Sequence, residues 1–235
     1  MYKGIYIALS GAVLKQSQME VITQNLANAD TVGYKKDKIS FKDYLMPMDI
    51  IGLQPDGKVM SSISSFKTDF SVGNLIKTGN SLDIALDGSG FIALEGDRYT
   101  RRGDLKRDRE GYLTTHNGIK VLGNNGPIRL PNGNVEISVT GGISVNGVQV
   151  DSIKIIDFPQ TESPSKVGEG IFFKNENGVK ANTSVKQGYL ETSNVDIIKE
   201  MVSMIETLRE FEAYQKAIQT FDEASAKINN EIGRF

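Results

Sequence analysis

The segment Gly88-Ser-Gly-Phe-Ile-Ala93 matches the G-x-G-x-x-A pattern of dinucleotide-binding loops. Such a loop binds pyrophosphate only when a helix follows it, because the helix N-terminus supplies the N–H donors and the positive end of the dipole. Here residues 91–94 form another short apolar run that ends at a turn, Glu95-Gly96. We therefore interpret the motif as part of a β-hairpin and predict no cofactor.

Acid–base chemistry is the next candidate. The only histidine, His116, has no sequence partner that would make it a general base. Asp104 with Asp108, and Asp83 with Asp87, are carboxylate pairs of the kind that can perform acid–base work. Polar positions beside strands and turns explain them more simply, so we predict that the chain is not an enzyme. The alternative is a secreted β-domain enzyme or binding module with a pocket around Asp104, Asp108 and His116.

Composition excludes several other classes of site. The 235 residues contain no cysteine, so disulfides and thiolate metal sites are ruled out, and we predict no metal. A net charge of −2 gives no global positive field, so we expect no nucleic-acid partner. The arginines between residues 98 and 109 alternate with acidic residues, which indicates a solvated surface of mixed sign. No apolar run is long enough for a membrane span, which argues against membrane insertion.

The stretch from residue 81 to 189 has the pattern of an antiparallel β domain. Short apolar runs alternate with turn signals, namely Asp87-Gly88, Glu95-Gly96, Glu110-Gly111, Asn117-Gly118, Asn132-Gly133 and Asn146-Gly147. Asn-Gly and Asp-Gly between short apolar runs are the strongest local hairpin signal that a sequence offers. This stretch therefore predicts a domain of the sandwich or barrel-like type.

Both ends of the chain have the pattern of amphipathic helices. The apolar positions of the first are Ile5, Leu9, Ala12, Met19, Ile22 and Leu26, and those of the second are Val195, Ile198, Val202, Ile205, Leu208, Phe211, Ile218, Phe221 and Ile228. This spacing places an apolar stripe along one side of each helix, and each stripe needs a matching surface. We predict that the first helix packs on the last and that both pack on other chains.

The sequence therefore predicts an α+β fold, in which long N- and C-terminal helices form a coiled-coil-like domain with a mainly antiparallel β domain inserted. We expect residues 1–30 and 190–235 in the helical domain, 31–80 in an extended connector with a short helical piece at 38–46, and 81–189 in the β domain. The start of the chain superficially resembles a signal peptide, but the helical stripe continues to Leu26, which favours a helix of the mature chain. Asn28 is expected to cap this helix, whereas Asn25 fits either a cap or a hydrogen bond to a neighbouring helix.

Three segments in order resemble the flagellar rod and hook proteins. The first contains Ser10-Gly-Ala12, Asn25-Leu26-Ala27-Asn28, Thr31 and Gly33-Tyr34-Lys35, and the last reads Gly188-Tyr-Leu-Glu-Thr-Ser193-Asn194-Val195-Asp196. The middle segment contains Gly88-Ser-Gly-Phe91, Tyr99-Thr-Arg101 and Gly111-Tyr-Leu113. The resemblance runs nearly from end to end, and its details favour the proximal-rod members, with the distal-rod members as the alternative.

This resemblance implies a structural subunit of the bacterial flagellar basal body. Family members are exported by the flagellar type III apparatus without cleavage of a signal, and they stack helically into the rod, an axial tube that spans the periplasm and transmits torque from motor to hook for motility. Their terminal helices line the inner tube and the β domain lies outside. The expected partners are copies of the chain, homologous rod proteins above and below, the export apparatus and, as a further candidate, the surrounding basal-body rings.

Overall fold

The computed structural model describes residues 2–45, 59–158, 164–174 and 178–232. The chain divides into two compact units. The helical unit comprises Met1–Ala27, Asp37–Lys67 and Asp196–Phe235, and the β unit comprises Asn28–Lys36 and Thr68–Val195. The chain therefore passes from one unit to the other at four points, after residues 27, 36, 67 and 195.

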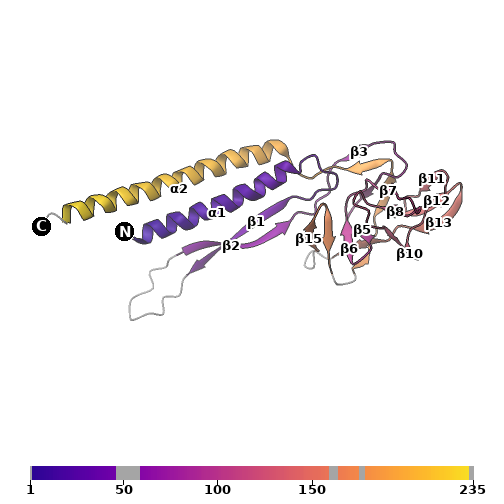
Figure 1. Cartoon of the computed structure of the whole chain (residues 1–235), viewed down its shortest axis with the longest axis horizontal. Coiled ribbons are helices and arrows are strands. Elements are labelled where there is room, and N and C mark those ends of the chain that lie inside the picture. The colour runs from indigo at the N-terminus through magenta and orange to yellow at the C-terminus, as the bar shows by residue number, and fades with distance from the viewer. Residues whose placement is uncertain (1, 46–58, 159–163, 175–177, 233–235) are drawn as a thin grey trace. The chain divides into compact units, whose positions relative to one another are not determined.

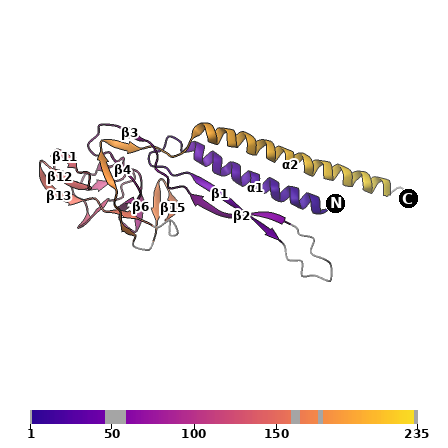
Figure 2. The same ribbon diagram turned by 180° about the vertical axis from the view of Figure 1, so that it is seen from behind.

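Two long helices dominate the helical unit, α1 (Tyr2–Ala27) and α2 (Ile197–Ile232). They run antiparallel, so that the N- and C-terminal ends lie at the same end of the pair in both views (Figures 1 and 2). Both helices confirm the prediction of helical ends, although α2 begins at Ile197, after the strand and the turn that the sequence interpretation had included in the helical domain.

The helical unit also contains two paired strands, β1 (Asp37–Leu45) and β2 (Val59–Thr68). The expectation of a short helical piece at 38–46 is wrong for its described part, because residues 38–45 belong to β1, while residue 46 lies outside the described residues. Ile39 and Phe41 alternate with polar residues, and this period of two suits a strand and not a helix.

The β unit consists of short strands joined by tight turns. They are β3 (Leu75–Lys77), β4 (Ile84–Asp87), β5 (Phe91–Leu94), β6 (Arg98–Thr100), β7 (Lys106–Arg107), β8 (Leu113–Thr114), β9 (Leu122–Gly123), β10 (Gly126–Pro127), β11 (Val135–Ile137), β12 (Gly142–Val145), β13 (Val148–Ser152), β14 (Ile155–Asp157), β15 (Ser165–Gly168), β16 (Ile171–Phe173), β17 (Val179–Lys180), β18 (Ser184–Gln187) and β19 (Tyr189–Glu191). The largest sheet has the order β15-β16-β6-β5-β14-β17, and every neighbouring pair in it is antiparallel.

Smaller sheets complete the unit. β11, β12 and β13 form a three-stranded antiparallel sheet, and four antiparallel pairs join β18 to β4, β19 to β3, β7 to β8 and β10 to β9. The mainly antiparallel architecture predicted from the turn spacing is confirmed. Asn146 and Gly147 connect β12 to β13 with φ angles of 52° and 78°, which is the left-handed conformation that an Asn-Gly hairpin turn requires.

Strand β5 is buried on both faces, because its side chains alternate between two cores. Ile92 and Leu94 belong to an aliphatic core, whereas Phe91 and Ala93 belong to a smaller aromatic core with Phe172. The rings of Phe91 and Phe172 pack edge to face with their centroids 5.3 Å apart. Double-sided burial explains why residues 91–94 are apolar without interruption.

Candidate functional site

The contact between α1 and α2 is made where α1 carries its smallest residues. A Cβ atom on Gly4 would lie 2.8 Å from the ring of Phe221, and one on Gly11 would lie 2.5 Å from the ring of Tyr214. Lys15 forms an ion pair with Glu210 at 2.5 Å, so the contacts step backward along α2 as they advance along α1. The glycines allow the two backbones to approach closely, and the aromatic rings of α2 fill the space above them.

The predicted apolar stripes occupy positions of different burial. On α1, Ala12 and Ile22 are buried, Ile5, Met19 and Leu26 are half-buried, and Leu9 is exposed. Along the C-terminal stripe, Phe211, Ile218 and Phe221 are half-buried, Val195 is half-buried within the β unit, and Ile198, Val202, Ile205, Leu208 and Ile228 are exposed. Part of each predicted stripe therefore packs within the helical unit, and the remainder is accessible in the single chain.

The exposed apolar residues near the start of α2 share one face of the helix, because they recur at intervals of three and four residues. Ile198, Met201, Val202, Ile205 and Leu208 are 75%, 53%, 50%, 53% and 42% exposed, and we call these five residues the α2 strip. On α1, Tyr6, Ile7, Leu9 and Val13 are exposed as well. Contiguous apolar surface of this kind is unusual on a soluble monomer and indicates a contact with another molecule.

Asn25, whose role the sequence left open, joins α1 to the start of β1. Its side-chain amide donates to the carbonyl oxygen of Asp37 at 2.9 Å, and its side-chain oxygen accepts from the backbone N–H of the same residue at 3.0 Å. The side-chain amide of Asn25 thereby pairs with both the N–H and the carbonyl of Asp37, as the backbone of a neighbouring strand would. Asn28 follows α1 and holds the next turn, where its carbonyl and side-chain oxygens accept from the backbone N–H and hydroxyl of Thr31.

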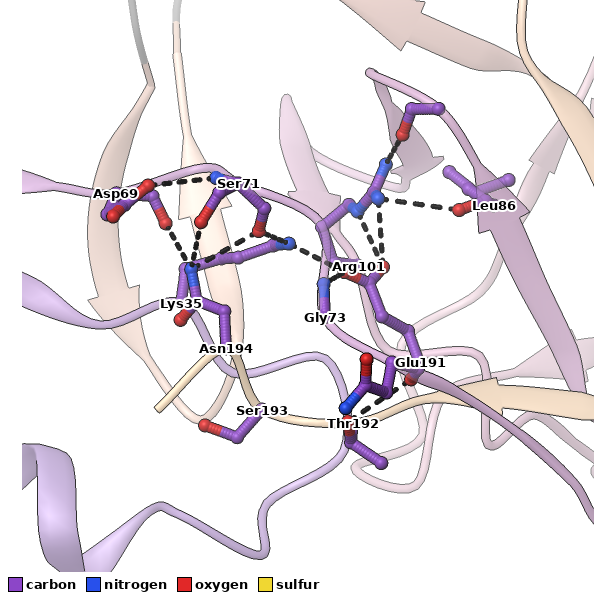
Figure 3. Close-up of polar contacts among 12 residues, drawn as sticks. Lys35, Asp69, Ser71, Gly73, Leu86, Arg101, Glu191, Thr192, Ser193 and Asn194 are labelled. Carbon is purple, nitrogen blue, oxygen red and sulfur yellow. Dashed lines mark hydrogen bonds and ion pairs between the residues drawn. The ribbon is translucent and has the colours of Figure 1, made fainter. Parts of the chain in front are cut away.

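The β unit contains a buried network of charges, drawn in Figure 3. The Glu191 carboxylate accepts from the ammonium of Lys35 at 2.6 Å and from the Nε of Arg101 at 3.0 Å. The backbone N–H of Gly73 donates to the same carboxylate at 2.9 Å. The side chains of Lys35, Glu191 and Arg101 are only 1%, 1% and 2% exposed. We call these three residues the buried triad.

The triad carries two positive charges and one negative charge, and backbone dipoles compensate for the excess. Lys35 donates to the carbonyl of Ser71 at 2.6 Å, and Arg101 donates to the carbonyls of Gly88 at 2.9 Å and Gly90 at 2.6 Å. The pKa of Lys35 and that of Arg101 both lie below their ordinary values, because burial penalises the charged forms more than the Glu191 carboxylate favours them. A buried ionic network is stable only when its members are paired in this way.

Several other residues of the segments that resemble the family lie around the triad. Gly33 has a φ of +65°, and a Cβ there would lie 2.7 Å from the backbone of Arg101, so only glycine fits. Tyr34 is buried, and the ammonium of Lys166 lies 3.8 Å from its ring centroid. Asn194 accepts from the backbone N–H of Lys36 at 2.8 Å, and the hydroxyl of Ser193 accepts from the N–H of Val195 at 3.3 Å.

The Gly88-Ser-Gly90 loop has the opposite polarity from a phosphate-binding loop. It presents two carbonyl oxygens to the guanidinium of Arg101, whereas a phosphate needs N–H donors. Strand β5 follows the loop, in agreement with the hairpin interpretation. The expectation of a solvated surface is wrong for Arg101, which is buried because Glu191 and these carbonyls replace the water around its charge.

The carboxylates considered for acid–base work have local partners. Asp104 pairs with Arg102 at 2.6 Å, and Asp83 accepts from the hydroxyl of Thr78 at 2.7 Å. Asp108 accepts from the backbone N–H of Tyr112 at 2.7 Å and so stabilises the turn before β8. Asp87 forms an exposed ion pair with Lys186. These contacts give each carboxylate a structural explanation.

Comparison with known proteins matches the same three segments. The family model "Flagella basal body rod protein" matches residues 5–35, "Flagellar hook protein FlgE/F/G D1 domain" matches 85–145, and "Flagellar basal body rod FlgEFG protein C-terminal" matches 186–231. The rod protein FlgG of Bacillus subtilis is 30% identical over 98% of this chain and 99% of its own length. The chain belongs to the flagellar basal-body rod proteins. FlgG of Agrobacterium fabrum is 28% identical over 98% of the chain, and FlgF of Caulobacter vibrioides is 27% identical over all of it.

In this rod protein, residues of the three segments that resemble the family lie around the triad and at the end of α1. Gly33, Tyr34 and Asn194 surround the triad, Asn25, Leu26 and Ala27 end α1, and Asn28 and Thr31 form the turn that follows. Lys35, Arg101 and Glu191 come from the first, middle and last of the three family-like segments, which the fold brings together. Sequence reasoning missed the triad, because nothing in the sequence distinguishes Lys35, Arg101 and Glu191 from the other charged residues of these segments. No helix in the described ranges is long and apolar enough to cross a membrane.

Proposed function

We propose that this structural rod subunit assembles helically through the exposed apolar residues of its terminal helices, with α1 and α2 on the inner side of the tube and the β unit outside. The α2 strip is the observation that carries this proposal, because five apolar side chains on one helical face are accessible in the single chain. A contact that does not close into a ring generates a filament from one repeated set of interactions. Copies of the chain and homologous rod proteins are the partners that such a filament requires.

Replacing Ile205 with Asp tests this assembly directly. Ile205 is 53% exposed, so a charge there is cheap in the single chain, but a charge buried without a partner in a packed tube costs several kcal/mol. In cells that lack the native gene, the Ile205→Asp chain should fold but be absent from purified basal bodies, and the cells should not swim. The matched control is Val148→Asp, also at an exposed apolar position but on β13, which should be incorporated. Normal incorporation of Ile205→Asp would contradict the proposal.

We propose further that the chain is a proximal-rod subunit, of the FlgF type, and not a distal-rod subunit, of the FlgG type. The alignment with FlgF runs over 245 residues and that with FlgG of Bacillus subtilis over 265, against 235 in this chain, so FlgF requires fewer gaps. The identity points the other way, at 27% for FlgF and 30% for FlgG. We give the length greater weight because insertions change the shape of a subunit in a close-packed tube. Labelling the chain in isolated rods tests this position. Label is expected in the proximal rod, and label at the distal, hook-facing end would contradict the proposal.

The same proposal includes export without a cleaved signal. It also includes contact with the export apparatus and the basal-body rings, and the absence of catalysis. The support for an uncleaved N-terminus is that Gly4 and Gly11 of α1 lie against aromatic rings of α2, so cleavage within this stretch would remove part of the helical unit. Intact-mass measurement of the chain extracted from basal bodies should find α1 complete. A mass lacking the first turns of α1 would contradict it.

A further inference from the structure

We propose that the buried triad is the centre of a clasp that orders, as one cooperative unit, the three chain segments through which the β unit is entered and left. These segments are residues 28–36, 68–74 and 188–195, and we call the triad with its polar contacts to them the clasp. Each segment ends at, or lies beside, a point where the chain passes to the helical unit, after residues 36, 67 and 195. The inference concerns the β unit alone and does not depend on how the chain assembles.

Glu191 is the member of the clasp on which the others depend. Its two carboxylate oxygens accept from Lys35 in the first segment, from the backbone N–H of Gly73 in the second, and from Arg101 in the body of the β unit. Lys35 also donates to the carbonyl of Ser71 in the second segment. One carboxylate therefore joins all three segments to the sheet that contains β6, which ends just before Arg101.

Backbone and amide contacts repeat the same connections outside the triad. The N–H of Gly33 donates to the carbonyl of Glu191 at 2.8 Å, and the N–H of Asp69 donates to the carbonyl of Lys36 at 2.8 Å. The side chain of Asn194 donates to the carbonyl of Asp69 at 2.8 Å (Figure 3). It also accepts from the N–H of Lys36 at 2.8 Å. The first segment thus contacts both of the others, and they contact each other.

The chemistry of the triad gives the clasp its specificity. Removing one partner of a buried ion pair is strongly destabilising, because the remaining charge stays buried without its counter-ion. The sequence separations are 156 residues for Lys35 to Glu191 and 90 for Arg101 to Glu191, so the pairs form only when distant segments are in register. The apolar side chains of the aliphatic core all come from residues 82–185 and include none from the first segment. The charged side chains of the clasp are therefore not part of that core, although Arg101 donates to the backbone carbonyl of Leu86, a core residue, at 3.5 Å.

Amide hydrogen exchange on the full-length chain tests the inference, because backbone N–H groups in all three segments donate to other residues of the clasp. In Glu191→Gln, which keeps the shape but removes the charge, exchange at Gly33, Lys36, Asp69 and Asn194 should accelerate together by at least about 100-fold. The core amides of Leu113, Val121 and Ile128, which donate to backbone carbonyls within the aliphatic core, should change by less than about threefold. The control, Asp87→Asn, breaks the exposed ion pair with Lys186 and should leave both groups unchanged.

Three exchange results would contradict the inference that the clasp is one cooperative unit. The four reporters could keep their protection in Glu191→Gln, they could respond independently of one another, or the core amides could accelerate equally. If Glu191→Gln does not fold, Lys35→Met provides the same test, because it removes one excess positive charge and leaves the pair of Arg101 and Glu191. Failure of both variants to fold would also overturn the inference, since the clasp would then be inseparable from the core. None of these outcomes bears on incorporation into the rod.

Discussion

The ammonium of Lys35 donates a hydrogen bond of 2.6 Å to the carboxylate of Glu191, although 156 residues separate them and both side chains are 1% exposed. The first of these residues follows the N-terminal helix and the second closely precedes the C-terminal helix. The β unit thereby holds its first and last segments together by a bond that does not involve its apolar cores. A rod subunit built in this way keeps the segments that lead to its two terminal helices in a fixed relation within the β unit.

Gly33→Ala should destabilise the β unit more than the same change at a matched glycine. Gly33 and Gly147 both have left-handed φ angles, +65° and +78°, so both pay the same backbone strain of about 1–2 kcal/mol. A Cβ at Gly147 meets nothing within 4 Å, whereas one at Gly33 would lie 2.7 Å from the backbone of Arg101. The overpacking should add about 1–3 kcal/mol to the loss of unfolding free energy for Gly33→Ala. Equal losses in denaturant titrations of the two variants would contradict the close approach.

Asn25→Ala should destabilise the helical unit by about 1–3 kcal/mol, because it removes two hydrogen bonds to the backbone of Asp37 from a side chain that is 2% exposed. Exchange of the Asp37 amide should accelerate in parallel. The control is Thr23→Ala, two residues earlier on α1, where the side chain is exposed and bonds only to its own helix. An Asp37 amide that exchanges at the wild-type rate in Asn25→Ala would show that Asn25 does not hold β1.

Gly11→Ala tests the close approach of α1 and α2 through the sign of its effect. In a helix without tertiary contacts, replacing Gly with Ala stabilises by about 1 kcal/mol. Here the added Cβ would lie 2.5 Å from the ring of Tyr214, so the substitution should instead destabilise, as overpacking does, by about 1–3 kcal/mol. In a Tyr214→Ala background the clash is absent, and Gly11→Ala should become stabilising. Thermal unfolding followed by circular dichroism measures both signs, and a stabilising effect in the wild-type background would rule out the predicted contact.

The start of α2 should depend on pH through Asp196. Its carboxylate accepts from the backbone N–H of Lys199 as a helix N-cap, and this bond, with the Lys199 side chain, lowers the pKa of Asp196 below its ordinary value of 3.8. Because the pKa is lower in the folded state, the stabilisation is fully present above the ordinary value and is lost as the pH falls through the folded-state pKa. The Lys199 amide resonance should therefore shift between about pH 5 and pH 2. The same shift in Asp196→Asn, which keeps an acceptor but cannot titrate, would contradict this assignment.

The terminal helices and the turn-rich β region could be predicted from the sequence, because both depend on local periodicity and turn chemistry. The face of α1 that packs on α2 could not be predicted in full. Periodicity selects the bulkiest apolar face, which includes Leu9, whereas the contact uses Gly4 and Gly11 because small residues allow the closest approach. When a helix has one face for its own partner helix and another apolar face for other molecules, a single sequence does not show which face makes which contact.

The buried triad could not be predicted for a different reason. Charged residues are read as solvated unless their partners are known, and the partners of Arg101 are a carboxylate 90 residues away and carbonyls of the Gly88–Gly90 loop. The available signal was the position of Lys35, Arg101 and Glu191 inside the three segments that resemble the family. Only the fold shows that these three segments meet.

The exposed apolar residues of the terminal helices form the surface through which we propose that the rod assembles. The most direct test is a cryo-electron microscopy reconstruction of basal bodies from cells whose only copy of this subunit is the present chain. We expect α1 and α2 in the inner wall of the axial tube, with Ile198, Val202 and Ile205 of the α2 strip packed against helices of neighbouring subunits. A chain that lay outside the axial tube, or an α2 strip that faced water in the assembled rod, would contradict this mode of assembly.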